Sequence, residues 1–83
     1  METRAALIAI IANDNKSSEQ INSVLHEYSE YIIGRMGIPY HQKDLFIISV
    51  AIDAPQDKIN SLAGVIGRIE GVTTKTVYAP EVN

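Results

Sequence analysis

Two short segments of the chain, Arg4–Ala12 and Leu45–Ile52, carry apolar residues at both alternating positions. An apolar run of this length, bounded by polar turn residues, is typical of a β-strand that is covered on both faces. Two other segments, Tyr31–His41 and Val72–Ala79, include Gly, Pro, Lys or Thr at intervals, as strands at the edge of a sheet do. The pattern therefore predicts two central strands and two edge strands.

Each central strand is followed by an amphipathic helix. Apolar residues recur at the helical spacing i, i+3, i+4, i+7 in two sets, Ile21, Val24, Leu25 and Tyr28, then Ile59, Leu62, Ala63 and Ile66. Ser17 or Ser18 is the candidate N-cap of the first helix. Pro55 suits the first position of the second helix, and Gly71 suits its C-terminal end.

The predicted order is β-α-β-β-α-β, and its two halves resemble each other. Ile21-Asn22-Ser23-Val24 in the first helix is matched by Ile59-Asn60-Ser61-Leu62 in the second. This order predicts an α+β fold, a ferredoxin-like βαββαβ sandwich with a four-stranded antiparallel sheet and two helices on one face. Residues 1–83 are expected to form a single domain, because this length allows no second core.

The central strands are apolar on the sheet face that the helices do not cover. An uncovered apolar sheet is a liability in water. We therefore expect a second copy of the chain to cover it, which gives a homo-oligomer, either a dimer or a tetramer.

The composition excludes several classes of chemical function. The 83 residues are 46% hydrophobic and 20% charged, with a net charge of −3, no Cys and two His. The missing Cys excludes disulfides, iron–sulfur ligation and thiol nucleophiles, and two His cannot supply a three-His metal site. The acidic balance argues against nucleic-acid binding. No apolar run approaches the roughly 20 residues that span a bilayer. We expect a cytoplasmic protein with no cofactor and no metal, and no catalytic constellation points to an enzyme.

Two stretches, Leu25–Tyr40 and Ser61–Val72, resemble the small bacterial proteins described as regulators of the iron-only hydrogenase system. The most distinctive element is Arg-x-Gly-x-Pro at Arg35, Gly37 and Pro39. The resemblance implies an ACT-like ferredoxin fold and a regulatory or ligand-sensing role. One alternative is a protein-binding assembly or maturation factor without a small ligand. Another is a small enzyme, as in dimeric ferredoxin-like monooxygenases.

Two more distant relatives bind their ligands through residues that this sequence largely lacks. The effector domain of the nickel-responsive repressor binds nickel through three His and one Cys. Only His26 falls on that set, while Gly37, Pro39 and Leu45 fall on or near the others and cannot bind metal through side chains. Amino-acid-binding ACT domains hold the ligand with a Gly-containing loop after the first strand. Here that loop, residues 13–16, has no Gly.

The candidate ligand-binding residues lie in the second strand: Arg35, Gly37, Pro39 and His41. If Met36, Ile38 and Tyr40 face the helices, Arg35 and His41 point to the open face of the sheet. There they would bind an anionic group such as a carboxylate or phosphate.

Each of these residues also has a purely structural interpretation. Arg35 and His41 can form an ion pair between subunits with an acidic residue such as Glu27 or Asp44. Gly37 and Pro39 can form a bulge that bends an edge strand.

Three further residues are candidates for a subunit interface. His26 lies away from the apolar stripe of its helix, so it is either a surface or interface residue or a ligand of a metal or small molecule. Gly64 and Gly67 interrupt the second helix, which favours close approach of another backbone.

Overall fold

The computed structural model describes residues 2–13 and 15–80. Along the chain, the elements are β1 (Arg4–Ala12), α1 (Asn15–Glu27), a 3₁₀ turn η1 (Ser29–Tyr31), β2 (Ile32–Tyr40), a second 3₁₀ turn η2 (His41–Lys43), β3 (Leu45–Ala54), α2 (Gln56–Gly67) and β4 (Val72–Tyr78). The predicted order of strands and helices is confirmed.

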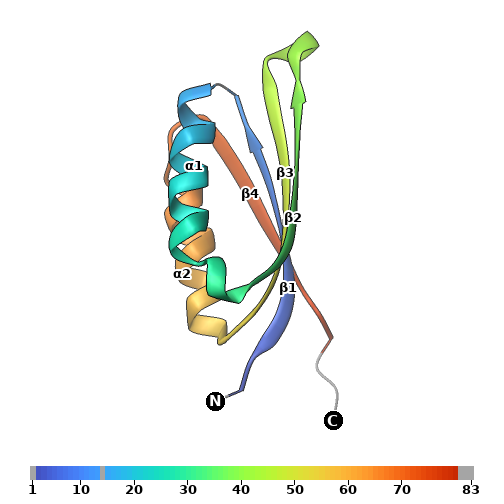
Figure 1. The fold of residues 1–83 in the computed structure, drawn as a ribbon, viewed down its shortest axis with the longest axis vertical. Coiled ribbons are helices and arrows are strands. Elements are labelled where there is room, and N and C mark those ends of the chain that lie inside the picture. The colour runs from blue at the N-terminus through green and yellow to red at the C-terminus, as the bar shows by residue number, and fades with distance from the viewer. Residues whose placement is uncertain (1, 14, 81–83) are drawn as a thin grey trace.

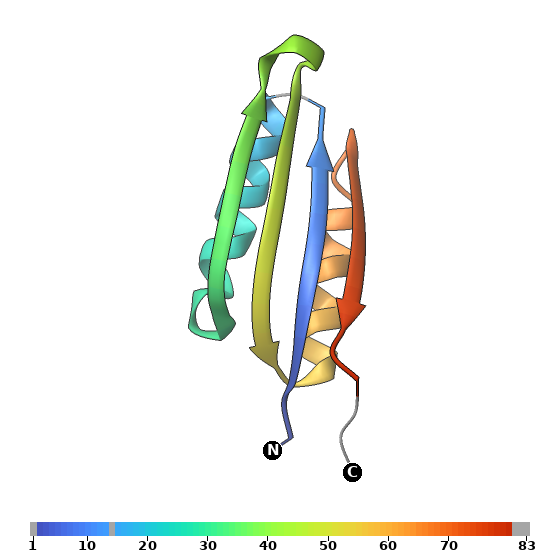
Figure 2. The ribbon, with the colours of Figure 1, turned by 90° about the vertical axis from the view of Figure 1, so that its right-hand side faces the viewer.

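The four strands form one antiparallel sheet in the order β2-β3-β1-β4. Both helices pack on the same face of this sheet, as Figure 1 shows. No other element of residues 2–13 and 15–80 covers the opposite face, and in Figure 2 all four strands lie open toward the viewer. The two strands that are apolar throughout are the central ones, and the ferredoxin-like fold is confirmed. Neither helix in the described part of the chain is long and apolar enough to cross a membrane.

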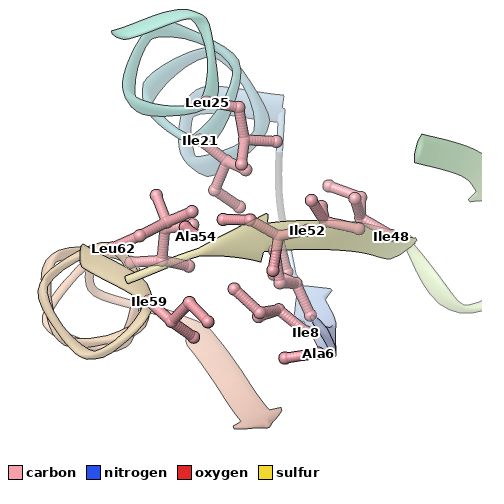
Figure 3. Packing of buried hydrophobic residues seen from close by; sticks show 13 residues of the cluster. Ala6, Ile8, Ile21, Leu25, Ile48, Ile52, Ala54, Ile59 and Leu62 are labelled. Carbon is pink, nitrogen blue, oxygen red and sulfur yellow. The ribbon is translucent and has the colours of Figure 1, made fainter. Parts of the chain in front are cut away.

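The core lies between the helices and the sheet. Alternate residues of β1 and β3 point toward the helices and are buried, among them Ile8, Ile10, Val50 and Ile52. The helices contribute five residues of their apolar stripes to the buried core: Ile21, Leu25, Ile59 and Leu62, which are labelled in Figure 3, and Ile66. Each large aliphatic side chain buried here contributes about 1.5–3 kcal/mol.

Three of the predicted helix boundaries differ from those in the structure. Helix α1 begins at Asn15, so Ser17 lies inside it, where its buried hydroxyl donates to the Glu70 carbonyl oxygen at 2.9 Å. Pro55 is the N-cap of α2 instead of its first helical residue. Gly71 lies beyond the end of α2, in the turn into β4, with a left-handed φ of 80°.

Candidate functional site

A bulge near the start of β2 decides which way the candidate residues point. Ile32 pairs with Ile52 of β3, but Gly34 pairs with Ala51, so Ile33 is an extra residue in the edge strand. Residues directly opposite in an antiparallel pair project to the same face. From Gly34 onward, the alternation of β2 is therefore reversed relative to Ile32.

Arg35, Gly37 and Pro39 consequently lie on the helix side of the sheet. They pair with Val50, Ile48 and Phe46, which face the core. Met36, Ile38 and Tyr40 lie on the open face instead. The predicted orientation of Arg35 was wrong, because a strict alternation from Tyr31 to His41 overlooks the bulge. The bulge itself is at Ile33 and not at Gly37 or Pro39.

Arg35 stands beside helix α1. Its guanidinium donates a hydrogen bond to the side-chain oxygen of Asn22, and the contact is exposed. Next to it, a Cβ added to Gly37 would meet no atom within 4 Å, so the helix side of the edge strand is open there. A guanidinium has five N–H donors in a planar fork. Arg35 therefore retains donors for a carboxylate or phosphate approaching over Gly37.

His41 does not belong to this site. It begins the turn η2 at the tip of the β2–β3 hairpin, outside the strand. Six residues of extended chain separate it from Arg35, a span of about 20 Å. The predicted basic pair of Arg35 and His41 therefore does not form within one chain.

His26 is exposed on α1 and lies in the last turn of the helix. Within residues 2–13 and 15–80, no three His, Asp or Glu side chains gather where they could hold a metal ion. His26 remains a predicted interface residue.

The two glycines of α2 differ in their surroundings. A Cβ at Gly67 would come within 3.1 Å of the Thr74 methyl group on β4, so the close neighbour of this glycine belongs to the same chain. A Cβ at Gly64 would meet only the Arg68 guanidinium, at 3.6 Å. Close packing inside the fold therefore accounts for Gly67, whereas a side chain at Gly64 would meet only the flexible end of Arg68.

The internal repeat has a structural role that the sequence reasoning missed. Asn22 of α1 accepts a hydrogen bond from Arg35 of edge strand β2, and Asn60 of α2 accepts one from the Tyr78 hydroxyl of edge strand β4. The Asn of the repeated Ile-Asn-Ser sequence thus joins each helix to the neighbouring edge strand by a hydrogen bond. The repeat was the available signal, because a polar residue kept in both copies indicates a shared contact.

Arg4 adds to the second of these connections. Its guanidinium lies 4.5 Å from the centre of the Tyr78 ring, donates to the Ala79 carbonyl oxygen at 3.0 Å and reaches the Gln56 side chain. From the start of β1, this one side chain thus contacts both the start of α2 and the end of β4.

The second candidate surface is the open face of the sheet. Eight large hydrophobic side chains are exposed among the described residues, and all but Ile33 lie on this face. These seven are Leu7, Ile11, Met36, Ile38, Tyr40, Ile47 and Val77. The apolar open face predicted from the central strands is confirmed, and edge strands β2 and β4 extend it.

A ferredoxin-like sheet with two helices on one face and an apolar opposite face is the architecture that ACT-like domains share with other ferredoxin-like domains. Residues 4–76 match the model of the TM1266-like family, described as a proposed regulator of the iron-only hydrogenase system. The chain belongs to this family, as its Arg-x-Gly-x-Pro element indicated. A search of curated proteins finds no match.

Solved structures agree with this assignment. The chain is 34% identical to the uncharacterized protein TM1266 from Thermotoga maritima, with a TM-score of 0.91 over 95% of this chain and 100% of the other. The ACT domain of a GTP pyrophosphokinase from Chlorobium tepidum is 22% identical, with a TM-score of 0.77 over 90% and 99% of the two chains. A nitrogen regulatory PII-like protein from Thiomonas intermedia K12, bound to ADP, AMP and bicarbonate, is 13% identical, with a TM-score of 0.53 over 96% and 100%. The last two show a shared fold.

Proposed function

We propose that the protein is a non-catalytic regulatory module of the iron-only hydrogenase system, which acts in the cytoplasm as a homo-oligomer and senses a small anionic ligand. The family match over residues 4–76 carries the regulatory assignment. The ACT-like fold supports a sensing role, since the PII-like neighbour with a related fold holds nucleotides and bicarbonate.

The ligand-binding residue in this proposal is Arg35, with Gly37 and Pro39 beside it on the helix side of β2. The contact to Asn22 uses one nitrogen of the guanidinium, and the side chain is exposed, which supports the availability of its other donors to a ligand. The missing side chain at Gly37 leaves room for a ligand against the strand. A carboxylate or phosphate is the group that such a donor fork recognises best.

A thermal-shift screen of the full chain tests ligand sensing. The panel contains amino acids, organic acids, nucleotides, S-adenosylmethionine and divalent metals. A ligand at 100 times its Kd adds about 2.7 kcal/mol to the free energy of unfolding. For a chain of this size, that raises Tm by roughly 10–20 °C.

The matched variants are Arg35→Ala and Arg68→Ala, because both residues are exposed arginines. We expect Arg35→Ala to abolish the shift and Arg68→Ala to retain it. A shift that survives in Arg35→Ala contradicts the assignment of the site. A panel without any shift contradicts sensing of those ligands.

A second candidate function is a protein-binding assembly or maturation factor without a small ligand. The exposed apolar face of the sheet favours it, because such a surface also fits a partner protein. This candidate predicts no ligand-induced shift and a direct complex with a purified hydrogenase maturation factor.

A further inference from the structure

The open face of the sheet has a pattern of large and small side chains that fits a second copy of itself. We infer that two chains pack these faces together as a symmetric dimer. The two-fold axis lies between the two sheets, parallel to their planes, and runs across the strands. This inference rests on the homo-oligomer of the proposed function. It identifies the surface through which the copies associate and the alignment of the two facing sheets.

Strand pairing arranges the open face in rows that cross the sheet from β2 to β4. The first row, nearer the hairpin tip, is Ile38, Ile47, Ile11 and Thr73. The second row is Met36, Ser49, Ala9 and Lys75. The third row is Gly34, Ala51, Leu7 and Val77. On the tip side of the first row, Tyr40 pairs with Leu45.

The first row is a ridge and the second is a groove at the two central strands. Ile47 and Ile11 stand side by side on β3 and β1, and the next row has Ser49 and Ala9 at the same two strands. Side chains of facing sheets interdigitate, so a ridge on one sheet needs a groove on the other. The ridge and the groove of this face lie next to each other.

A two-fold axis between these rows places each ridge in the partner's groove. Ile47 then lies over the partner's Ser49, and Ile11 over the partner's Ala9. The same operation sets Tyr40 over the partner's Gly34, again a large residue over a small one. Each strand then lies over its own copy and runs nearly antiparallel to it, as in aligned sheet packing.

Charge is compatible with this arrangement. Lys75 is the one charged residue in the three rows, and it lies at the β4 edge. The axis places it opposite the partner's Thr73 and not opposite its own copy. An axis through the second row itself would bring the two Lys75 side chains together, which is unfavourable.

The area is sufficient for a dimer. Four strands at about 4.8 Å spacing and seven to nine residues at about 3.4 Å give a flat area of roughly 500 Å² per copy. The relief of the side chains makes the accessible area larger than this flat value. A stable interface buries about 600–1,000 Å² per partner. The face therefore lies at the lower end of that range, and a dimer needs nearly all of it.

The first test compares one substitution at two positions. Ser49 lies at the centre of the open face, whereas Ser23 is exposed on the outer side of α1. Ser49→Lys places a charge in the interface and is expected to weaken the dimer roughly 100-fold or more. Ser23→Lys is the matched control and should leave it intact. Mass is measured by sedimentation velocity over a dilution series, with circular dichroism to confirm the fold.

The second test addresses the register. Ile11→Ala removes the large side chain that packs over the partner's Ala9, and Ala9→Ile fills the groove that receives the partner's Ile11. Each variant is expected to weaken the dimer roughly tenfold. The double variant exchanges ridge and groove, and it should recover most of the lost affinity. Both positions lie on the open face, so the core stays unchanged.

The outcomes separate this inference from the proposed function. A dimer disrupted by Ser49→Lys and restored in the double variant supports the inference. An oligomer that persists in Ser49→Lys overturns it, while the homo-oligomer of the proposed function stands. Disruption without recovery in the double variant overturns the register. A wild-type chain that stays monomeric overturns both the inference and the homo-oligomer.

Discussion

The two glycines of helix α2 provide a matched pair for testing how closely this helix packs on the sheet. Replacing Gly by Ala inside a helix stabilises it by about 0.8–1.0 kcal/mol when the new methyl group meets no obstacle. At Gly64, the added Cβ lies 3.6 Å from the Arg68 guanidinium, an ordinary contact with a flexible side chain. We therefore expect Gly64→Ala to gain nearly the full amount.

At Gly67 the same substitution meets β4. The added Cβ would lie 3.1 Å from the Thr74 methyl group, so one of the two must move by a few tenths of an ångström. Thr74 is β-branched and held in a strand, which limits its side-chain adjustment. Overpacking of this kind costs about 1–3 kcal/mol. Gly67 is also the last residue of the helix, where the gain in helix propensity is smaller.

The two variants should therefore differ by about 2 kcal/mol, with Gly64→Ala more stable than wild type and Gly67→Ala less stable. For a domain of this size, that corresponds to roughly 8–16 °C in Tm. Calorimetry at one fixed protein concentration measures the difference, because dimerisation also shifts Tm. Equal stabilisation by both variants would refute the close approach of α2 to β4. Destabilisation by Gly64→Ala would show that Gly64 contacts another chain.

Three further substitutions test contacts that join distant parts of the chain. Gly71→Ala should lower the free energy of unfolding by about 2 kcal/mol or more, measured by urea denaturation. The reason is that φ is 80° and the new Cβ would clash with the Asn13 side-chain oxygen. Adding Asn13→Ala should relieve the clash but not the backbone strain, and an unchanged loss would show that the clash does not occur. Thr74→Val should raise stability by about 1 kcal/mol, since the buried Thr74 hydroxyl has no hydrogen-bond partner among the described residues. A loss of stability would mean that the hydroxyl is bonded. Tyr78→Phe should cost about 1 kcal/mol by removing the hydrogen bond to Asn60. In an Asn60→Ala background the same change should have little effect, and a full effect there would contradict the pairing.

Much of the fold could be predicted because its determinants are local. The apolar runs of β1 and β3 identify the two central strands, and the helical stripes containing Ile21 and Ile59 identify the two helices that cover them. The exposed apolar face was also predictable. A strand that is apolar on both sides needs two covers, and the two helices provide only one.

The candidate site was less predictable, since it depends on the register in which β2 pairs with β3. One extra residue at Ile33 reverses the alternation of β2 and moves Arg35 from the open face to the helix side. Nothing in the local sequence marks Ile33 as a bulge, because a bulge is defined by pairing with β3. His41 lies outside the site for a related reason, as the strand ends at Tyr40 and turns.

The sequence by itself determined the order of the elements, their buried faces and the family, because hydrophobic periodicity and the Arg-x-Gly-x-Pro element are properties of neighbouring residues. Only the tertiary structure decided which side of the sheet Arg35 occupies, that Gly67 packs against Thr74, and that Asn22 and Asn60 each fasten a helix to an edge strand. These features join residues far apart in the chain, and their geometry exists only once the strands have paired.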